Sequence, residues 1–471
     1  MQAAAAGRAI RRATTFQLVF LTYSVVCSGA YGLEQMVSAA GPGLALTLLL
    51  VLPVLWGIPI SLACAELSSH YPVEGGYYRW VRAAFGDFIG YQAGWLVWLA
   101  NLMTNAAFAV LFASYLRYFI PDLGTTGHYL VALMLIWGTT LLNCFGIRLV
   151  GTTAVVLTCL IFLPFLGLTA GGFLQWTHAP FVPFAHPDKT LAAAFTEGLL
   201  IALWLYGGYE KLTPNAEEVE NPSRAFPIAL AIAMPMVIGS YLLPTFAGLV
   251  ACDGWRDWGE AHFTVLAGQV GGAPLAAAMS IGGLLSNTCI LMVTILGQSR
   301  LPMVLAQDRL FPRLFARVDL KFGTPTPSLV AGALALSLLA FLPFAALAGL
   351  FSLVQVLAYV LICAALLRLR RQRARGQAPA GFGSAAGAAG RPFRVPLGLP
   401  GMVAILLPVF ALTTFVVVRQ LWPDEGLDLK AIATDLLVFA SGPLTYVLFR
   451  WHARRGDPEG NLGGRESSLG V

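Results

Sequence analysis

The chain has 471 residues, of which 58% are hydrophobic and only 11% are charged, with a formal net charge of +6 and a mean hydropathy of +0.74. A soluble globular protein carries about 25% charged residues. Long apolar runs with so few charges exclude a soluble globular domain and indicate a protein that crosses a membrane many times.

The N-terminal segment MQAAAAGRAIRRATTFQ is basic and leads into the first apolar run. It resembles the start of a signal peptide, but the apolar run holds Glu34 and lacks a clear small-x-small cleavage site. We therefore expect residues 1–14 to be a cytoplasmic N-terminus and the apolar run to remain in the protein as a membrane span.

The apolar runs predict an all-α integral membrane protein with twelve transmembrane helices, because about 20 apolar residues cross a bilayer core of ~30 Å. These spans are predicted at residues 15–40, 43–67, 88–119, 128–146, 149–174, 190–216, 226–250, 273–299, 326–345, 348–369, 401–421 and 434–451.

The distribution of Lys and Arg over the loops predicts the orientation, because cytoplasmic loops carry the excess of positive charge. With the N-terminus inside, the outer side holds only a few of the 29 Lys and Arg residues. These are Arg117, Lys189, Arg256, Arg419 and Lys430. A missed span would have mixed the two sides, so we expect cytoplasmic N- and C-termini in a multi-pass protein of the plasma (inner) membrane.

Two segments outside the spans have their own composition. Residues 370–400 are predicted to be a basic, flexible cytoplasmic loop, in which RLRRQRARG (368–376) is followed by the glycine-rich AGFGSAAGAAG. The basic cluster is typical of topology control and contact with anionic lipid headgroups of the bilayer, and the glycine-rich run of a linker. Residues 452–471 are predicted to be a disordered cytoplasmic tail.

Motifs of catalysis are absent from the sequence. No nucleotide-binding glycine loop, zinc-protease motif or Ser/His/Asp arrangement occurs, and neither the seven cysteines nor the six histidines are spaced as metal ligands. We therefore expect no enzyme activity, no metal, no cofactor and no nucleic-acid partner. The oligomeric state is not indicated by the sequence.

Two spans carry a glycine break followed by an acid. The first holds Gly29, Tyr31, Gly32 and Glu34, within CSGAYGLEQMV (27–37), and the sixth holds Gly207, Gly208, Tyr209 and Glu210. Spans one and six correspond if the first ten spans are two five-helix halves. Gly-interrupted spans in corresponding positions are the best sequence indication of a midplane binding site in a secondary transporter.

A broken helix leaves carbonyl groups unpaired on one side of the gap and amide N–H groups unpaired on the other. In hydrocarbon each unpaired group costs several kcal/mol, so a break persists only where it lines a cavity or meets a partner. A substrate ammonium would bind the carbonyls. The alternative for either break is a glycine-mediated kink or helix crossing.

The two acids are candidates for substrate recognition and proton coupling, since ionisable residues inside a membrane are functional by default. Glu34, at the start of the second half-helix, selects for cations if it faces the cavity and merely caps the helix if it does not. Glu210 carries the coupling proton, because burial favours the protonated carboxyl, unless it pairs with the neighbouring Lys211.

Three stretches then resemble the amino acid–polyamine–organocation (APC) transporters, over nearly the whole chain: PVEGGYYRWVRAAFGDFIGYQAGW from residue 72, GYEKLTPNAEEVENPSRAFPIAL from 208 and SRLPMVLAQDRLFPRLFARV from 299. The opening stretch is most similar to the polyamine-uptake branch. The resemblance implies a leucine-transporter-type fold, with two inverted five-helix repeats (15–174 and 190–369) plus two extra helices (401–451).

The resemblance also implies which residues contact substrate. These are Ser28, Gly29, Ala30, Tyr31, Gly32 and Glu34 in the first span, and Trp204, Tyr206, Gly207, Gly208, Tyr209 and Glu210 in the sixth. Asn105 of the third span is a further candidate, with interhelical hydrogen bonding as its alternative role. The polyamine branch tends to place an acid beside that asparagine, where this chain has Thr104.

The sequence thus predicts a secondary active transporter that moves a polyamine or an amino acid by alternating access with proton symport. The alternatives are an amino acid permease or exchanger for zwitterionic substrates and, more remotely, a non-transporting membrane sensor. Glu66, at the inner end of the second span, is predicted to fix an inner loop by hydrogen bonds, with a role in an inner gate as the alternative.

Overall fold

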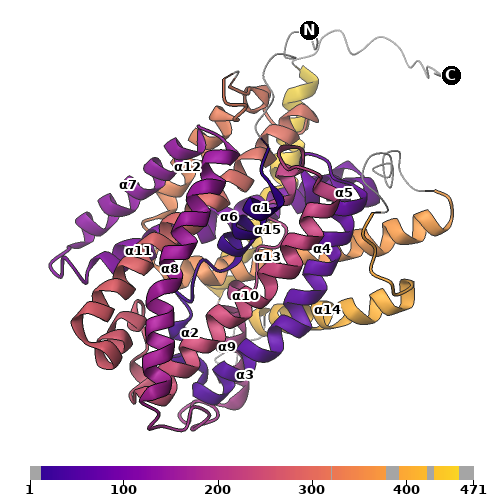
Figure 1. The fold of residues 1–471 in the computed structure, drawn as a ribbon. Coiled ribbons are helices and arrows are strands. Elements are labelled where there is room, and N and C mark those ends of the chain that lie inside the picture. The colour runs from indigo at the N-terminus through magenta and orange to yellow at the C-terminus, as the bar shows by residue number, and fades with distance from the viewer. Residues whose placement is uncertain (1–11, 320, 378–391, 422–428, 456–471) are drawn as a thin grey trace, which may run out of the picture.

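The computed structural model describes residues 12–319, 321–377, 392–421 and 429–455. In these ranges the regular structure is helical, apart from one isolated backbone bridge between Ala13 and Val219. The helices form a single bundle with α1 (Thr15–Val26) in its interior (Figure 1). The all-helical class that the sequence predicts is confirmed.

The other helices are α2 (Glu34–Ala40), α3 (Pro42–Leu52), α4 (Ile58–His70), α5 (Gly76–Phe85), α6 (Asp87–Leu116), α7 (Thr125–Asn143), α8 (Ile147–Leu174), α9 (Leu191–Leu205), α10 (Pro222–Ala251), α11 (His262–Gln307), α12 (Thr326–Leu339), α13 (Phe344–Ala374), α14 (Leu399–Leu421) and α15 (Leu429–Arg455). A π-helical turn, Pro53–Gly57, joins α3 to α4 without a break in the helix.

Eight helices of the described chain are long and apolar enough to cross a membrane. They are Pro42–His70, Asp87–Leu116, Thr125–Asn143, Ile147–Leu174, Pro222–Ala251, His262–Gln307, Ala346–Ala374 and Leu399–Arg419. Shorter apolar helices are Thr15–Val26, Leu191–Leu205, Thr326–Leu339 and Leu436–Trp451. The protein is therefore a multi-pass membrane protein; the count of twelve crossings stays a prediction.

The first predicted span is two helices with an irregular stretch between them. α1 begins at a capping box, in which the Thr14 side chain accepts from the Gln17 amide and the Gln17 side chain accepts from the Thr14 amide. α1 ends at Val26, and helical structure resumes only at Glu34. The predicted break is thus present in the structure.

Glycine is required at this break because the backbone there turns to positive φ. Gly29 has φ +103° and Gly32 has φ +92°, a region that costs little only for glycine. A Cβ on Gly32 would lie 3.0 Å from the indole ring of Trp204. The second glycine therefore allows the Trp204 ring to pack directly on the broken backbone.

The sixth predicted span breaks in the same place but continues differently. α9 ends at Leu205, the chain is irregular through Leu212, and only a 3-10 turn, Thr213–Glu218, follows. No second α-helix follows, because Val219 takes an extended conformation and forms a backbone bridge to Ala13. The expected span at 190–216 is thus one helix and one tight turn.

The two breaks lie against each other. Gly208 has φ +113°, and a Cβ there would lie only 3.0 Å from the carbonyl oxygen of Val25 at the end of α1. α1 is packed among α8, α10 and α11, while α6 lies against α11 and α13. α14 contacts α13, α4 and α9, and α15 contacts α6, so the last two helices flank the bundle that holds both breaks.

Candidate substrate-binding site

A small central cavity lies where the two breaks meet. It is lined by Val25, Val26, Cys27 and Tyr31 of the first break, by Trp204, Leu205, Gly207 and Lys211 of the second, and by Thr104, Phe108, Tyr241 and Ile290 of neighbouring helices. Its volume is about 10 Å³, enough for about one water molecule. The cavity is therefore closed around the position where a substrate would meet both breaks.

The carbonyl ends of both broken helices share one hydroxyl group. The Tyr241 hydroxyl of α10 lies 3.0 Å from the carbonyl oxygen of Val26 and 3.0 Å from that of Leu205. A hydroxyl has one proton to donate, so it satisfies one carbonyl fully at any moment. A substrate ammonium, with three donors, would satisfy both carbonyls together.

We expect Tyr241→Phe to destabilise the substrate-free protein and to increase the stabilisation that substrate gives. Removal of the hydroxyl leaves buried acceptors unpaired, which costs about 1–3 kcal/mol each, and a bound ammonium would restore their partners. The measurement is the melting temperature in detergent with and without a transported substrate. Tyr206→Phe is the matched control, because the Tyr206 hydroxyl donates to the Leu49 carbonyl, outside the breaks. An equal substrate-induced shift in both variants would contradict the prediction.

The Glu34 carboxylate bonds the backbone of the first break. The Gly32 amide donates to Glu34 Oε2 at 2.7 Å, and the Tyr115 hydroxyl of α6 donates to Oε1 at 2.7 Å. The Glu34 side chain is fully buried but does not line the central cavity. In this conformation Glu34 bonds the backbone of the break just before α2 and faces away from the cavity.

Side chains of α13 form hydrogen bonds with the polar groups of the second break. The Gly208 amide donates to the Tyr359 hydroxyl at 2.6 Å, and that hydroxyl donates to Glu210 Oε2 at 2.6 Å. Gln355 donates to Glu210 Oε1 at 2.8 Å. The carboxylate of Glu210 is buried and faces α13 rather than the central cavity.

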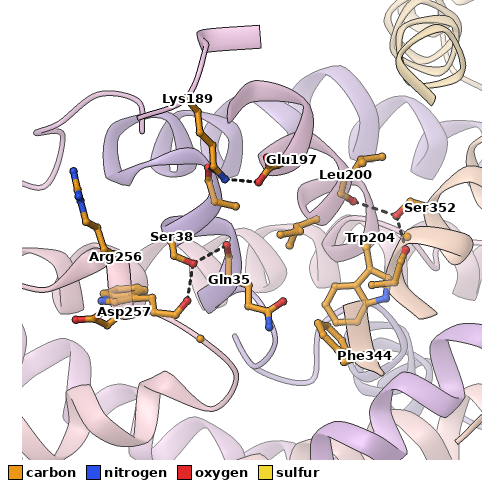
Figure 2. A pocket seen from close by; sticks show the side chains of 16 residues that line it. Gln35, Ser38, Lys189, Glu197, Leu200, Trp204, Arg256, Asp257, Phe344 and Ser352 are labelled. Atoms are coloured by element: carbon orange, nitrogen blue, oxygen red, sulfur yellow. Dashed lines mark hydrogen bonds and ion pairs between the residues drawn. The ribbon is translucent and has the colours of Figure 1, made fainter. Parts of the chain in front are cut away.

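Trp204 separates the central cavity from a much larger vestibule of about 570 Å³, shown in Figure 2. Its indole ring lines both spaces, its Nε1 donates to the Thr104 hydroxyl at 3.0 Å, and its ring packs edge-on against Phe344. The vestibule wall also carries the ion pair between Lys189 and Glu197, with 2.6 Å between Nζ and Oε2. Access to the cavity from this side requires movement of the Trp204 ring.

We expect Trp204→Ala to join the two spaces and so to expose Cys27, which lines the central cavity. In a variant with Cys27 as the remaining cysteine, labelling by a small maleimide should become several-fold faster. Leu200→Ala is the control, because Leu200 lines the vestibule and not the central cavity. Equal labelling rates in the two variants would contradict a separating role for the Trp204 ring.

The opposite end of the bundle is closed by ion pairs. Arg300 of α11 lies 2.5 Å from Glu218, which follows the second break, and the Arg82 guanidinium of α5 lies 2.7 Å from Asp308, which follows α11. Arg370 of α13 pairs with the buried Glu66 of α4. These contacts hold the elements below both breaks together, so the cavity is shut on this side.

Glu66 has the hydrogen-bonding role that the sequence predicts. Its carboxylate accepts from Arg370 and from the backbone amide of Val395, which belongs to the segment just before α14. Arg370 also donates to the Leu397 carbonyl at 2.9 Å. The pair therefore anchors the described end of the predicted 370–400 loop against α4 and α13.

The structure brings only some of the predicted site residues to the central cavity. Tyr31, Trp204 and Gly207 line it. The others do not line it: Ser28, Gly29, Ala30, Gly32, Glu34, Asn105, Tyr206, Gly208, Tyr209 and Glu210. Asn105 donates to Gln298 at 2.6 Å and accepts from Thr294 at 2.5 Å, both on α11.

Sequence reasoning missed several residues at the breaks, among them Tyr115 of α6. Tyr241 lies on a span without any glycine break, and the sequence indicates Lys211 only as a partner of Glu210. Gln355 and Tyr359 follow Phe351 at intervals of four residues, which places all three on one face of α13. That polar and aromatic stripe within an apolar span is the signal that would have identified them.

Comparisons with known proteins agree with this architecture. The family model described as "Amino acid permease" matches residues 14–444. The chain belongs to this family. The APC resemblance and the predicted class of transporter, rather than enzyme, are thereby confirmed.

This chain is also similar to transporters from plants. The polyamine transporter PUT1 of Oryza sativa subsp. japonica is 32% identical over 436 residues, covering 91% of this chain and 78% of the relative. A probable polyamine transporter of Arabidopsis thaliana is 29% identical over 458 residues, 95% of this chain and 86% of the relative. The polyamine transporter RMV1 of Arabidopsis thaliana is 29% identical over 409 residues, 85% and 79% respectively.

Proposed function

We propose that the protein is a secondary active transporter that moves a small amine-bearing substrate, a polyamine or an amino acid, by alternating access. The observation that carries this proposal is the meeting of two helix breaks around one closed cavity, with paired carbonyl groups from Val26 and Leu205 directed at the same hydroxyl. An ammonium group is the substrate chemistry that such a pair of carbonyls would bind. The names of the plant relatives support an amine-bearing substrate.

The proposed fold has twelve crossings, with inverted five-helix repeats at 15–174 and 190–369. The corresponding positions of the two breaks, after α1 and after α9, support this arrangement. The excess of Lys and Arg on the side of the termini supports cytoplasmic termini in the plasma membrane. With that orientation the vestibule opens to the outside and the ion-paired end faces the cytoplasm.

Alternating access then requires two sets of contacts to change in turn. Substrate entry moves Trp204 and brings the vestibule into continuity with the cavity. Release to the cytoplasm separates Arg300 from Glu218, because this pair lies between α11 and the turn below the second break. The Trp204 ring on one side and the ion pairs on the other fit a bundle with two alternative closures.

Proton coupling is assigned in this proposal to Glu210, with Glu34 as the second candidate. Glu210 accepts two hydrogen bonds as a carboxylate, from Tyr359 and from Gln355. A proton on Glu210 would convert one acceptor oxygen into a donor and would free the Tyr359 hydroxyl, which also accepts from the Gly208 amide. Protonation of Glu210 would thus change the hydrogen bond between Tyr359 and the backbone of the second break.

Uptake into proteoliposomes tests the proposed function. We expect saturable uptake of labelled putrescine or of a labelled amino acid, faster when the outside is acid, since the inward proton gradient then drives symport. Glu210→Gln should abolish the stimulation by the pH gradient and retain exchange of internal for external substrate. Uptake that does not saturate would contradict transport by a substrate-binding site. Saturable uptake without any effect of the pH gradient would contradict proton coupling.

A further inference from the structure

Lys211 is the one charged residue among the residues that line the central cavity. It lies in the irregular stretch after the second break, and its side chain is only 4% exposed. The side chain passes Gly208, where an added Cβ would lie 3.4 Å from Lys211 Cδ. The ammonium group is thus held at the breaks, beside the backbone that a substrate would contact.

Within the described part of the chain, no carboxylate lies within 4 Å of Lys211 Nζ. The neighbouring Glu210 turns the other way and is occupied by Gln355 and Tyr359. The ammonium lies over the Phe351 ring, 5.4 Å from its centroid. A buried charge normally has an ionic partner, because an unpaired one is costly in a medium of low dielectric constant.

The acids near the cavity are not available to a cationic substrate in this conformation. Both carboxylate oxygens of Glu34 are occupied, one by the Gly32 amide and the other by the Tyr115 hydroxyl. A substrate in the central cavity therefore meets both carbonyl groups and a basic side chain in the wall of one cavity. That combination matches an ammonium and a carboxylate carried by the same molecule.

We propose that Lys211 binds the carboxylate group of the substrate, so that the transported species is an amino acid rather than its decarboxylated amine. This inference rests on the proposed function and decides between its two substrate classes. The substrate ammonium binds the carbonyl groups of Val26 and Leu205, and its carboxylate lies within 4 Å of Lys211 Nζ, which no carboxylate of the described chain does. A diamine offers no such group, and its second ammonium would be repelled by Lys211.

Three pairs of compounds that differ by one carboxylate test the proposal: ornithine and putrescine, arginine and agmatine, leucine and isoamylamine. Uptake of each labelled compound into proteoliposomes gives its half-saturating concentration. In at least one pair the wild type should take up the amino acid with a half-saturating concentration at least about tenfold lower than that of the amine, as expected where a buried group must be paired. The proposal would be overturned by saturable uptake in which, in every pair, the half-saturating concentration of the amine is equal to or lower than that of the amino acid.

Variants of Lys211 separate this inference from the proposed function. Lys211→Met should remove the preference for the amino acid, and Lys211→Arg should keep it. Lys321→Met is the control, because Lys321 is exposed in the loop before α12. A preference that survives Lys211→Met would overturn the assignment of Lys211, and the wild-type comparison decides the substrate class even if that variant does not fold. No saturable uptake of any of the six compounds would overturn the proposed function itself, and this inference with it.

Discussion

Replacement of Glu66 by glutamine is expected to lower the melting temperature of the protein by several degrees. Glu66 and Arg370 have side chains only 3% and 5% exposed, and their carboxylate and guanidinium groups are in direct contact. The substitution leaves the Arg370 charge buried without its partner, and loss of one member of such a pair costs about 3–5 kcal/mol. It also weakens the contact to the Val395 amide, so the segment before α14 loses its anchor.

The control for this prediction is Glu197→Gln. Glu197 pairs with Lys189 at 2.6 Å, but the two side chains are 48% and 31% exposed, and a pair so accessible to water contributes about 0–1 kcal/mol. The melting temperatures of both variants are measured in the same detergent by intrinsic fluorescence. Similar small decreases in both would mean that the buried pair does not hold the described end of the loop in place.

Gly208→Ala is expected to abolish most transport while leaving the protein folded. The new Cβ would meet the Val25 carbonyl oxygen at 3.0 Å on a backbone with φ +113°, and a side chain in this conformation costs about 1–3 kcal/mol. The substitution strains the backbone where the two breaks are in contact, and it also strains the Gly208 amide that donates to Tyr359. Initial uptake by proteoliposomes should fall by about tenfold, the equivalent of ~1.4 kcal/mol of lost stabilisation.

Gly239→Ala in α10 is the matched control, because a Cβ there would have no atom within 4 Å. This variant should transport at the wild-type rate, since alanine is favoured over glycine in a helix. Normal uptake by both variants would show that close approach of the breaks is not needed for transport.

The helix breaks could be predicted from the sequence because their cause is local. Gly29, Gly32 and Gly208 adopt positive φ, and glycines followed by an acid in an apolar span are visible without any knowledge of neighbouring helices. The second half of the sixth span was predicted less well. Its 3-10 turn ends where Val219 becomes extended and bridges to Ala13, a residue far away in the sequence.

The partners of the unpaired groups could not be predicted, because they come from helices far away in the sequence. Tyr241 reaches the carbonyl ends from α10, Tyr115 reaches Glu34 from α6, and Tyr359 reaches Glu210 from α13. Periodicity shows that each tyrosine lies in a span, but not which break its hydroxyl meets. The direction of Lys211 is likewise decided by packing, since Glu210 beside it turns to α13.

The orientation of the two acids changes how the site is understood. From the sequence, Glu34 and Glu210 are the groups that would attract a cation. In the structure the Glu34 carboxylate accepts from the Gly32 amide and Tyr115, and the Glu210 carboxylate accepts from Tyr359 and Gln355. Lys211 is the charged group that lines the cavity. A site that combines carbonyl groups with a lysine favours a substrate with both charges, which is why the paired compounds discriminate so directly.

Hydrogen–deuterium exchange tests most directly the central claim that one substrate binds both helix breaks. Exchange is followed by mass spectrometry with and without a saturating concentration of the compound that the wild type transports best. The account predicts that substrate slows exchange in peptides covering residues 27–33 and 206–212 together, with little change in α7. Protection limited to the vestibule segments 186–189 and 254–260, with neither break affected, would contradict it.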